Sequence, residues 1–156
     1  VEQARQIHKL NPTPTAALGR VLTMAVMMGS QLKEEGGKVT VQVLGDGPLG
    51  KIIVSGNNKC EVKGCVDNPL AEAPLNSIRK LNVGAIVGKG TINVVKDIGL
   101  KEPYVGNVPI QTGEIAEDFA YYYAVSEQIP TAVALGVLVN KNGRKRFGGA
   151  TVQSVE

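Results

Sequence analysis

Residues 39–56, VTVQVLGDGPLGKIIVSG, contain two apolar segments joined by a short glycine-rich stretch, and this pattern indicates the class of fold. Val39, Val41 and Val43 alternate with Thr40 and Gln42, a period of two that is typical of a strand with one buried face. A glycine-rich stretch, GDGPLG, then leads directly into a second apolar run. Because so short a connection cannot hold a crossover helix, the two strands are predicted to run antiparallel. This pattern disfavours a doubly wound parallel sheet.

Short apolar runs bounded by turn residues predict further strands downstream, at residues 60–66, 83–87, 91–96 and 108–112. Gly88-Lys89-Gly90 separates two of these runs and predicts a second hairpin. Residues 131–139 are apolar on both alternating faces, so we expect this strand to be covered on both sides. The turn sequence at residues 140–143, NKNG, should return the chain as a last antiparallel strand.

Three segments show the spacing of helices. Residues 1–10 are amphipathic, Thr13 before Pro14 predicts the start of a long helix, and Thr112 is predicted to cap another. Gly19 and Gly29 fall inside the long helix, which indicates close packing there. The expected fold is α+β, with mainly antiparallel sheets in short hairpins and two or three packed helices, forming a single domain over residues 1–156.

The composition narrows the class of protein. The 156 residues are 43% hydrophobic, enough for a genuine core, and the net charge of +3 is far below that of a dedicated nucleic-acid binder. Two cysteines and one histidine exclude a disulfide-stapled scaffold and a zinc site built from four thiolates. The apolar runs are too short to span a bilayer, so we expect a cytoplasmic protein without membrane contact.

Candidate catalytic motifs have simpler explanations. The GDGPLG stretch fits the spacing of a dinucleotide-binding turn, but a strand follows it and Pro48 removes an amide donor. Glu114, Glu117 and Asp118 could bind a hard metal, yet acidic residues in a first helical turn are explained by the helix dipole. We therefore predict no catalytic, cofactor-binding or metal-binding residue in this chain, and no enzyme activity.

Two further features remain open. Cys60 and Cys65 are expected on opposite faces of one strand, roughly 16 Å apart, with one of them buried and no disulfide between them. A basic hairpin tip at residues 141–146 could contact RNA phosphates, although no aromatic platform accompanies it. The basic residues of that tip are Lys141, Arg144, Lys145 and Arg146.

Four long stretches are similar to a known family. PTAALGR at 14–20, GDGPLG at 45–50, VGKGTINVVKDIGLKEPYVG at 87–106 and TGEIAEDFAYYYAVSEQIPTAVALGVLV at 112–139 resemble the redox-regulated heat-shock chaperones known as 33 kDa chaperonins. The resemblance covers nearly the whole chain and is weakest at its end, GGATVQSVE.

The resemblance implies an ATP-independent holdase that binds unfolding proteins under oxidative or heat stress. Edge strands and exposed apolar area also lead us to expect a homodimer. The resemblance also implies zinc in a separate four-cysteine domain that has no counterpart here, so the chain is expected to be a fragment. No specific nucleic acid is expected as a partner.

Because residues 131–139 are apolar on both faces, we predict that this strand is part of the client-binding surface and that a linker shields it in the intact protein. The alternative is that the helix beginning near Pro14 covers the strand. The predicted client-binding residues are Val133, Leu135, Val137 and Val139.

Overall fold

The computed structural model describes residues 1–139 and, as backbone, residues 148–154. Its main sheet has five antiparallel strands in the order β3-β2-β1-β4-β5. These are β1 (Lys38–Gly45), β2 (Lys51–Asn57), β3 (Val62–Val66), β4 (Gly90–Asp97) and β5 (Tyr104–Pro109). A separate antiparallel pair joins β6 (Thr131–Val137) to β7 (Gly148–Ser154).

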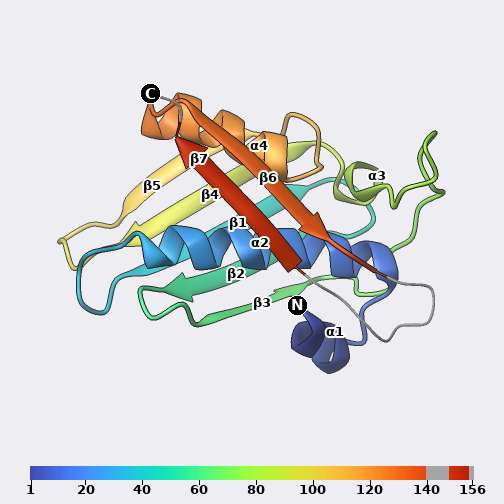
Figure 1. Ribbon diagram of the computed structural model, residues 1–156, viewed down its shortest axis with the longest axis horizontal. Coiled ribbons are helices and arrows are strands. Elements are labelled where there is room, and N and C mark those ends of the chain that lie inside the picture. Colours follow the sequence, from blue (N-terminus) through green and yellow to red (C-terminus); the bar gives the residue numbers. More distant parts are fainter. Residues whose placement is uncertain (140–147, 155–156) are drawn as a thin grey trace.

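Helices lie between and beside these sheets. They are α1 (Glu2–His8), α2 (Pro12–Ser30), α3 (Val83–Val87) and α4 (Ala116–Tyr122), which continues directly into a π-helix, η1 (Tyr123–Glu127). Figure 1 shows α2 lying across one face of the five-stranded sheet, with the β6–β7 hairpin crossing α2 on its other side. The predicted α+β class is confirmed, although the described residues form four α-helices rather than two or three.

The core lies between the sheet and α2. Val39, Val41 and Val43 are fully buried, and Val41 pairs with Val54 on β2 and Val94 on β4, which are also fully buried. The alternation of residues 38–45 thus produces the half-buried strand that the sequence predicts, and GDGPLG forms the connection between β1 and β2.

Both glycines of α2 are packing positions, as predicted. A Cβ on Gly29 would lie 2.5 Å from the backbone oxygen of Asn57, and one on Gly19 would lie 2.8 Å from Cγ2 of Val137. The helix begins one residue earlier than Thr13, at Pro12, with Asn11 as its N-cap. The prediction of Thr13 as the cap is wrong because proline already fits the first helical position.

The predicted strand at residues 83–87 is wrong. These residues form α3, since the Asn82 side chain accepts a hydrogen bond from the Ala85 amide and Gly88 ends the turn at φ 77°. The strand expected at 91–96 exists as β4, but its partner is β1 rather than residues 83–87. A five-residue apolar run cannot by itself be assigned to strand or helix.

The other shifted boundaries have local causes. Cys60 lies in a turn at φ 61°, so β3 begins only at Val62, and both cysteines are exposed, which corrects the expectation that one is buried. The strand expected at 108–112 is β5, which ends at Pro109.

The helix α4, which the sequence predicts to be capped by Thr112, begins later than expected. It starts at Ala116 rather than after Thr112, because Asp118 accepts hydrogen bonds from the backbone amides that precede the helix. Those amides belong to Gln111, Thr112 and Ile115, at 2.7, 2.8 and 2.9 Å.

Candidate functional site

The strand β6 lies with one face toward the core. Val133, Leu135 and Val137 are half-buried and pack against the core cluster on α2 and α4, while Val139 is half-buried just beyond the strand. The helix beginning near Pro12 therefore covers these side chains. Whether the predicted residues contact clients stays a prediction.

The opposite face of β6 is exposed. Ala132, Ala134 and Gly136 are open to solvent, and Leu138, just beyond the strand, is 61% exposed. Within the part of the chain that the structure describes, the expectation of cover on both sides is wrong. The outward residues other than Leu138 are small, so this strand exposes little apolar area despite its apolar sequence.

A larger open surface lies on the outer face of the five-stranded sheet. Every second strand residue points away from α2, and no helix of residues 1–139 covers that side (Figure 1). One row of cross-strand neighbours runs Ser55, Thr40, Val95, Val105, and a second runs Ile53, Gln42, Asn93, Asn107. We call the residues of these two rows the open sheet face.

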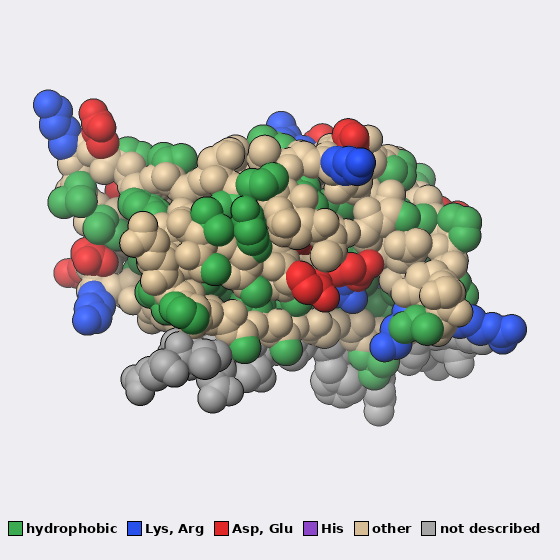
Figure 2. All heavy atoms as spheres, turned by 90° about the horizontal axis from the view of Figure 1, so that it is seen from above, with side chains coloured by type: hydrophobic (Ala, Val, Ile, Leu, Met, Phe, Trp, Pro, Cys, Tyr) green, Lys and Arg blue, Asp and Glu red, His purple; other side chains and the backbone are tan. Residues whose placement is uncertain are grey.

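The eight residues of the open sheet face are uncharged, but Lys63 on β3 continues the first row next to Ser55. The apolar members of the open sheet face are Ile53, Val95 and Val105, and Val105 is 59% exposed on the edge strand β5. Charged residues lie around it, among them Lys51 and Lys38 toward the ends of β2 and β1. Figure 2 views the neighbouring side of the molecule, over α4 and β5, where hydrophobic side chains reach the surface between separated charged ones. The surface suits an uncharged, partly apolar ligand.

A buried polar cluster supports β5 from the inner side. Tyr122 donates a hydrogen bond to Oε1 of Glu127 at 2.7 Å, and Lys96 forms an ion pair with the same oxygen. Burial raises the pKa of Tyr122, and the bond to Glu127 raises it further; burial also raises the pKa of Tyr123 to about 12. For Glu127, burial acts to raise the pKa, but the hydrogen bonds from Lys96 and Tyr122 outweigh it and hold the pKa below its ordinary value. The cluster fixes η1 against β4 and β5.

Comparisons with known proteins identify the family. The family model described as "Hsp33 protein" matches residues 1–156. This chain belongs to the Hsp33 family. It is 55% identical over 140 residues to a 33 kDa chaperonin of Acetivibrio thermocellus and 56% identical over 144 residues to one of Caldanaerobacter subterraneus, covering 90% and 92% of this chain. The crystal structure of the 33 kDa chaperonin (heat shock protein 33 homolog) of Thermotoga maritima matches with a TM-score of 0.90 at 44% identity, over 97% of this chain.

The match covers only part of each relative. This Hsp33-family chain spans about half the length of the curated relatives it matches, 47% and 49% of the two named above and 52% of the Thermotoga chain. Among the described residues, no helix combines the length and apolar character that crossing a bilayer requires.

Zinc does not fit the residues described for this chain. No three His, Cys, Asp or Glu side chains within residues 1–139 gather into a group that could hold a metal ion. Cys60 and Cys65 are free, exposed thiols on a turn and an edge strand. No chemical step through zinc is therefore derived for these residues.

The candidate carboxylates have structural roles. Glu114 forms an ion pair with Arg20 at 2.8 Å and accepts a hydrogen bond from the Gly84 amide, so it ties α2 to α3. Asp118 is fully buried and caps α4, whereas Glu117 is exposed. The basic tip at residues 141–146 lies outside the described residues.

Sequence reasoning missed the open sheet face. It identified the buried valines of β1 correctly, but the residues alternating with them were read only as solvent-facing partners. One sequence signal could have indicated this face. Four outward positions on the adjacent strands β1 and β4 are all uncharged, which is unusual for solvent-facing residues: Thr40, Gln42, Asn93 and Val95.

Proposed function

We propose that this chain is the client-binding part of a chaperone that holds unfolding proteins without ATP, and that the open sheet face is the surface that contacts them. The observation that carries the proposal is a five-stranded sheet with α2 on one side and, on the other, a face that no helix of residues 1–139 covers and whose two rows on β2, β1, β4 and β5 hold no charged residue. Membership of the Hsp33 family, whose relatives are named chaperonins, supports it.

The exposed chemistry suits segments of unfolded chain. Apolar side chains from Ile53, Val95 and Val105 supply hydrophobic contact, while Gln42 and Asn93 can hydrogen-bond to a peptide backbone. Neither contact depends on a particular client sequence. A surface of this kind binds many unfolded segments weakly, as a holdase requires.

The remaining expectations extend this proposal. We infer that the whole protein is regulated by redox state through a zinc-binding four-cysteine domain outside this chain, acts in the cytoplasm during heat or oxidative stress, and forms homodimers. The resemblance to 33 kDa chaperonins supports these statements.

Suppression of aggregation tests the proposal. Light scattering from a thermally unfolding enzyme should fall when the purified chain is added without ATP. The double substitution Val95→Thr, Val105→Asp removes apolar contact and places a charge on the open sheet face, so it should abolish most of this suppression. Leu100→Asp, on a residue 66% exposed in the β4–β5 connection, is the matched control and should retain full activity. Full suppression by a folded double variant would refute the role of this face.

The predicted residues on β6 need a separate test. Val133→Asp or Val137→Asp should destabilise the domain, because both side chains pack against the core. If such a variant folds, with an unchanged circular dichroism spectrum, and loses suppression while the open-face variant keeps it, β6 rather than the sheet contacts clients. A folded variant with full activity removes β6 from the client surface.

A further inference from the structure

A pocket of about 280 Å³ opens at one corner of the five-stranded sheet, beside the open sheet face. It is lined by Lys38, Ser55, Gly56, Asn57, Glu61, Val62 and Lys63, which come from β1, β2, β3 and the turn between β2 and β3. Ser55 belongs to both the pocket and the open sheet face. Anything bound along that row of the sheet therefore reaches the pocket without a break.

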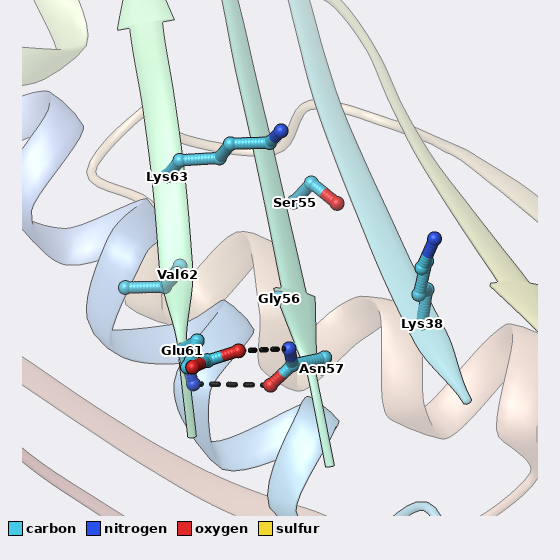
Figure 3. A pocket seen from close by; sticks show the side chains of 7 residues that line it. All are labelled: Lys38, Ser55, Gly56, Asn57, Glu61, Val62 and Lys63. Atoms are coloured by element: carbon cyan, nitrogen blue, oxygen red, sulfur yellow. Dashed lines mark hydrogen bonds between the residues drawn. The ribbon is translucent and has the colours of Figure 1, made fainter. Parts of the chain in front are cut away.

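The two lysines of the pocket form no ion pair in the described part of the chain, although Asp97 lies opposite Lys38 in the register of β1 and β4. Neither Lys38 nor Lys63 has a carboxylate within 4.0 Å of its amine among the described residues. Figure 3 shows the Lys63 side chain reaching across β2 toward Ser55, with Lys38 on the other side of Ser55. The hydroxyl of Ser55 is free to donate to a ligand, since no hydrogen bond engages it in the described part of the chain.

The acidic residue of the pocket is held away from the lysines. Oε2 of Glu61 accepts a hydrogen bond from Nδ2 of Asn57 at 2.7 Å, and the Glu61 amide donates to Oδ1 of Asn57 at 3.1 Å (Figure 3). These two bonds hold Glu61 against Asn57 in the connection between β2 and β3. Two ammonium groups and one carboxylate leave the pocket with one net positive charge, placed beside a hydroxyl.

We propose that this pocket binds the carboxylate of an acidic side chain in an extended client segment lying across the open sheet face. The inference rests on the proposed function and adds the chemistry of the segment that this face prefers. Ammonium groups and a hydroxyl are the partners that a carboxylate takes in proteins.

The geometry of the sheet sets the spacing of that segment. Ser55 on β2 and Val105 on β5 are three strands apart in one row, which is about 14 Å at ~4.8 Å per strand. An extended chain advances roughly 3.3 Å per residue, so four residues span this distance. Side chains four residues apart point to the same side of an extended segment. If an apolar side chain of the bound segment contacts Val105, the side chain four residues further along that segment therefore lies over the pocket.

Binding of a synthetic peptide pair tests the inference. The probe is a fluorescein-labelled, twelve-residue peptide with valine at position 4, glutamate at position 8 and uncharged polar residues elsewhere, and its partner has glutamine at position 8. Fluorescence anisotropy should show that the glutamine peptide binds the purified chain about 3- to 10-fold more weakly, as expected for one carboxylate meeting two partly exposed ammonium groups. The difference should shrink in high salt.

Variants locate the effect in the pocket. Lys38→Gln combined with Lys63→Gln should weaken binding of the glutamate peptide by the same factor and leave the glutamine peptide unaffected. Lys51→Gln, at the opposite end of β2, is the matched control and should change neither affinity. All three lysines are exposed, so these variants should fold normally.

The outcomes separate this inference from the proposed function. Equal binding of both peptides, or an equal loss in the Lys51 variant, overturns the pocket as a carboxylate site while the sheet still binds clients. Failure of both peptides to bind, together with full aggregation suppression by the open-face variant, overturns the open sheet face as the client surface and the pocket with it.

Discussion

Gly29 allows a test of how closely β2 approaches α2. Alanine at an interior helical position is normally favourable, because it stabilises a helix by about 1 kcal/mol relative to glycine. Here the added Cβ would lie 2.5 Å from the backbone oxygen of Asn57 and 3.1 Å from its carbonyl carbon. Backbone atoms cannot rotate aside as a flexible side chain does, so the helix or the end of β2 must move.

The two effects have opposite signs, and the clash should be larger. Overpacking costs about 1–3 kcal/mol, and a contact this short with a backbone atom belongs to the upper part of that range, about 2–3 kcal/mol. Subtracting the gain in helix propensity of about 1 kcal/mol leaves a net loss of about 1–2 kcal/mol. For a domain of this size, each kcal/mol shifts the midpoint by about 2–4 °C, so Gly29→Ala should lower Tm by about 2–8 °C.

Calorimetry or thermal circular dichroism measures this shift. Ser30→Ala, at the adjacent exposed position, is the control and should change Tm by no more than about 2 °C. A Gly29→Ala protein that is more stable than the wild type would show that α2 and β2 are not in contact here and would refute the packing argument.

Three further predictions concern buried polar groups. Asp118→Ala leaves three backbone amides without their acceptor, so urea unfolding should show a loss of about 3–5 kcal/mol, and a loss under 1 kcal/mol would contradict the capping role. Burial raises the pKa of Tyr123 to about 12 in the folded protein, so above pH 10 this tyrosine ionises more readily in the unfolded chain and the free energy of unfolding falls as the pH rises. The difference in the free energy of unfolding between Tyr123→Phe and the wild type should therefore move in favour of the variant by about 1.4 kcal/mol from pH 8 to pH 11. A difference that stays constant with pH would refute this. The pKa of Glu127 is lowered in the folded state, so its contribution to stability is present above the ordinary glutamate pKa and is lost as the pH falls through the folded pKa. Glu127→Gln should therefore destabilise the protein at pH 7 and make its stability depend less on pH in the acid range. Urea unfolding between pH 7 and pH 2 measures both effects.

Local patterns predicted the first half of the sheet well. Alternation in residues 38–45 and the short glycine-rich connection were sufficient to place β1 and β2 and to orient them antiparallel. The pairing of β1 with β4 was not predicted, because it joins segments about 50 residues apart and no local signal reports it. The assumed hairpin between 83–87 and 91–96 took the place of this long-range pairing.

The candidate site was predicted less well than the fold. Residues 131–139 were read as the concealed apolar surface because both of their faces are apolar, but one face packs against α2 and the other consists mostly of small residues. The open sheet face was overlooked because its members are moderately polar and lie on four different strands. Only the cross-strand register brings Ser55, Thr40, Val95 and Val105 into one row.

The packing of α2 explains why the inner face of β6 is covered while the outer face of the five-stranded sheet is open. Thirteen of its 19 residues are buried, so α2 requires cover on both sides, and the sheet can supply only one. The β6–β7 hairpin supplies the other, with Val137 beside Gly19. Binding a client on the inner face of β6 would first expose the buried side of α2, at a cost of roughly 25 cal/mol for each Å² of apolar surface. The outer face of the five-stranded sheet requires no such opening, since its side chains already face solvent. A holdase without an energy source should therefore use the sheet before the hairpin.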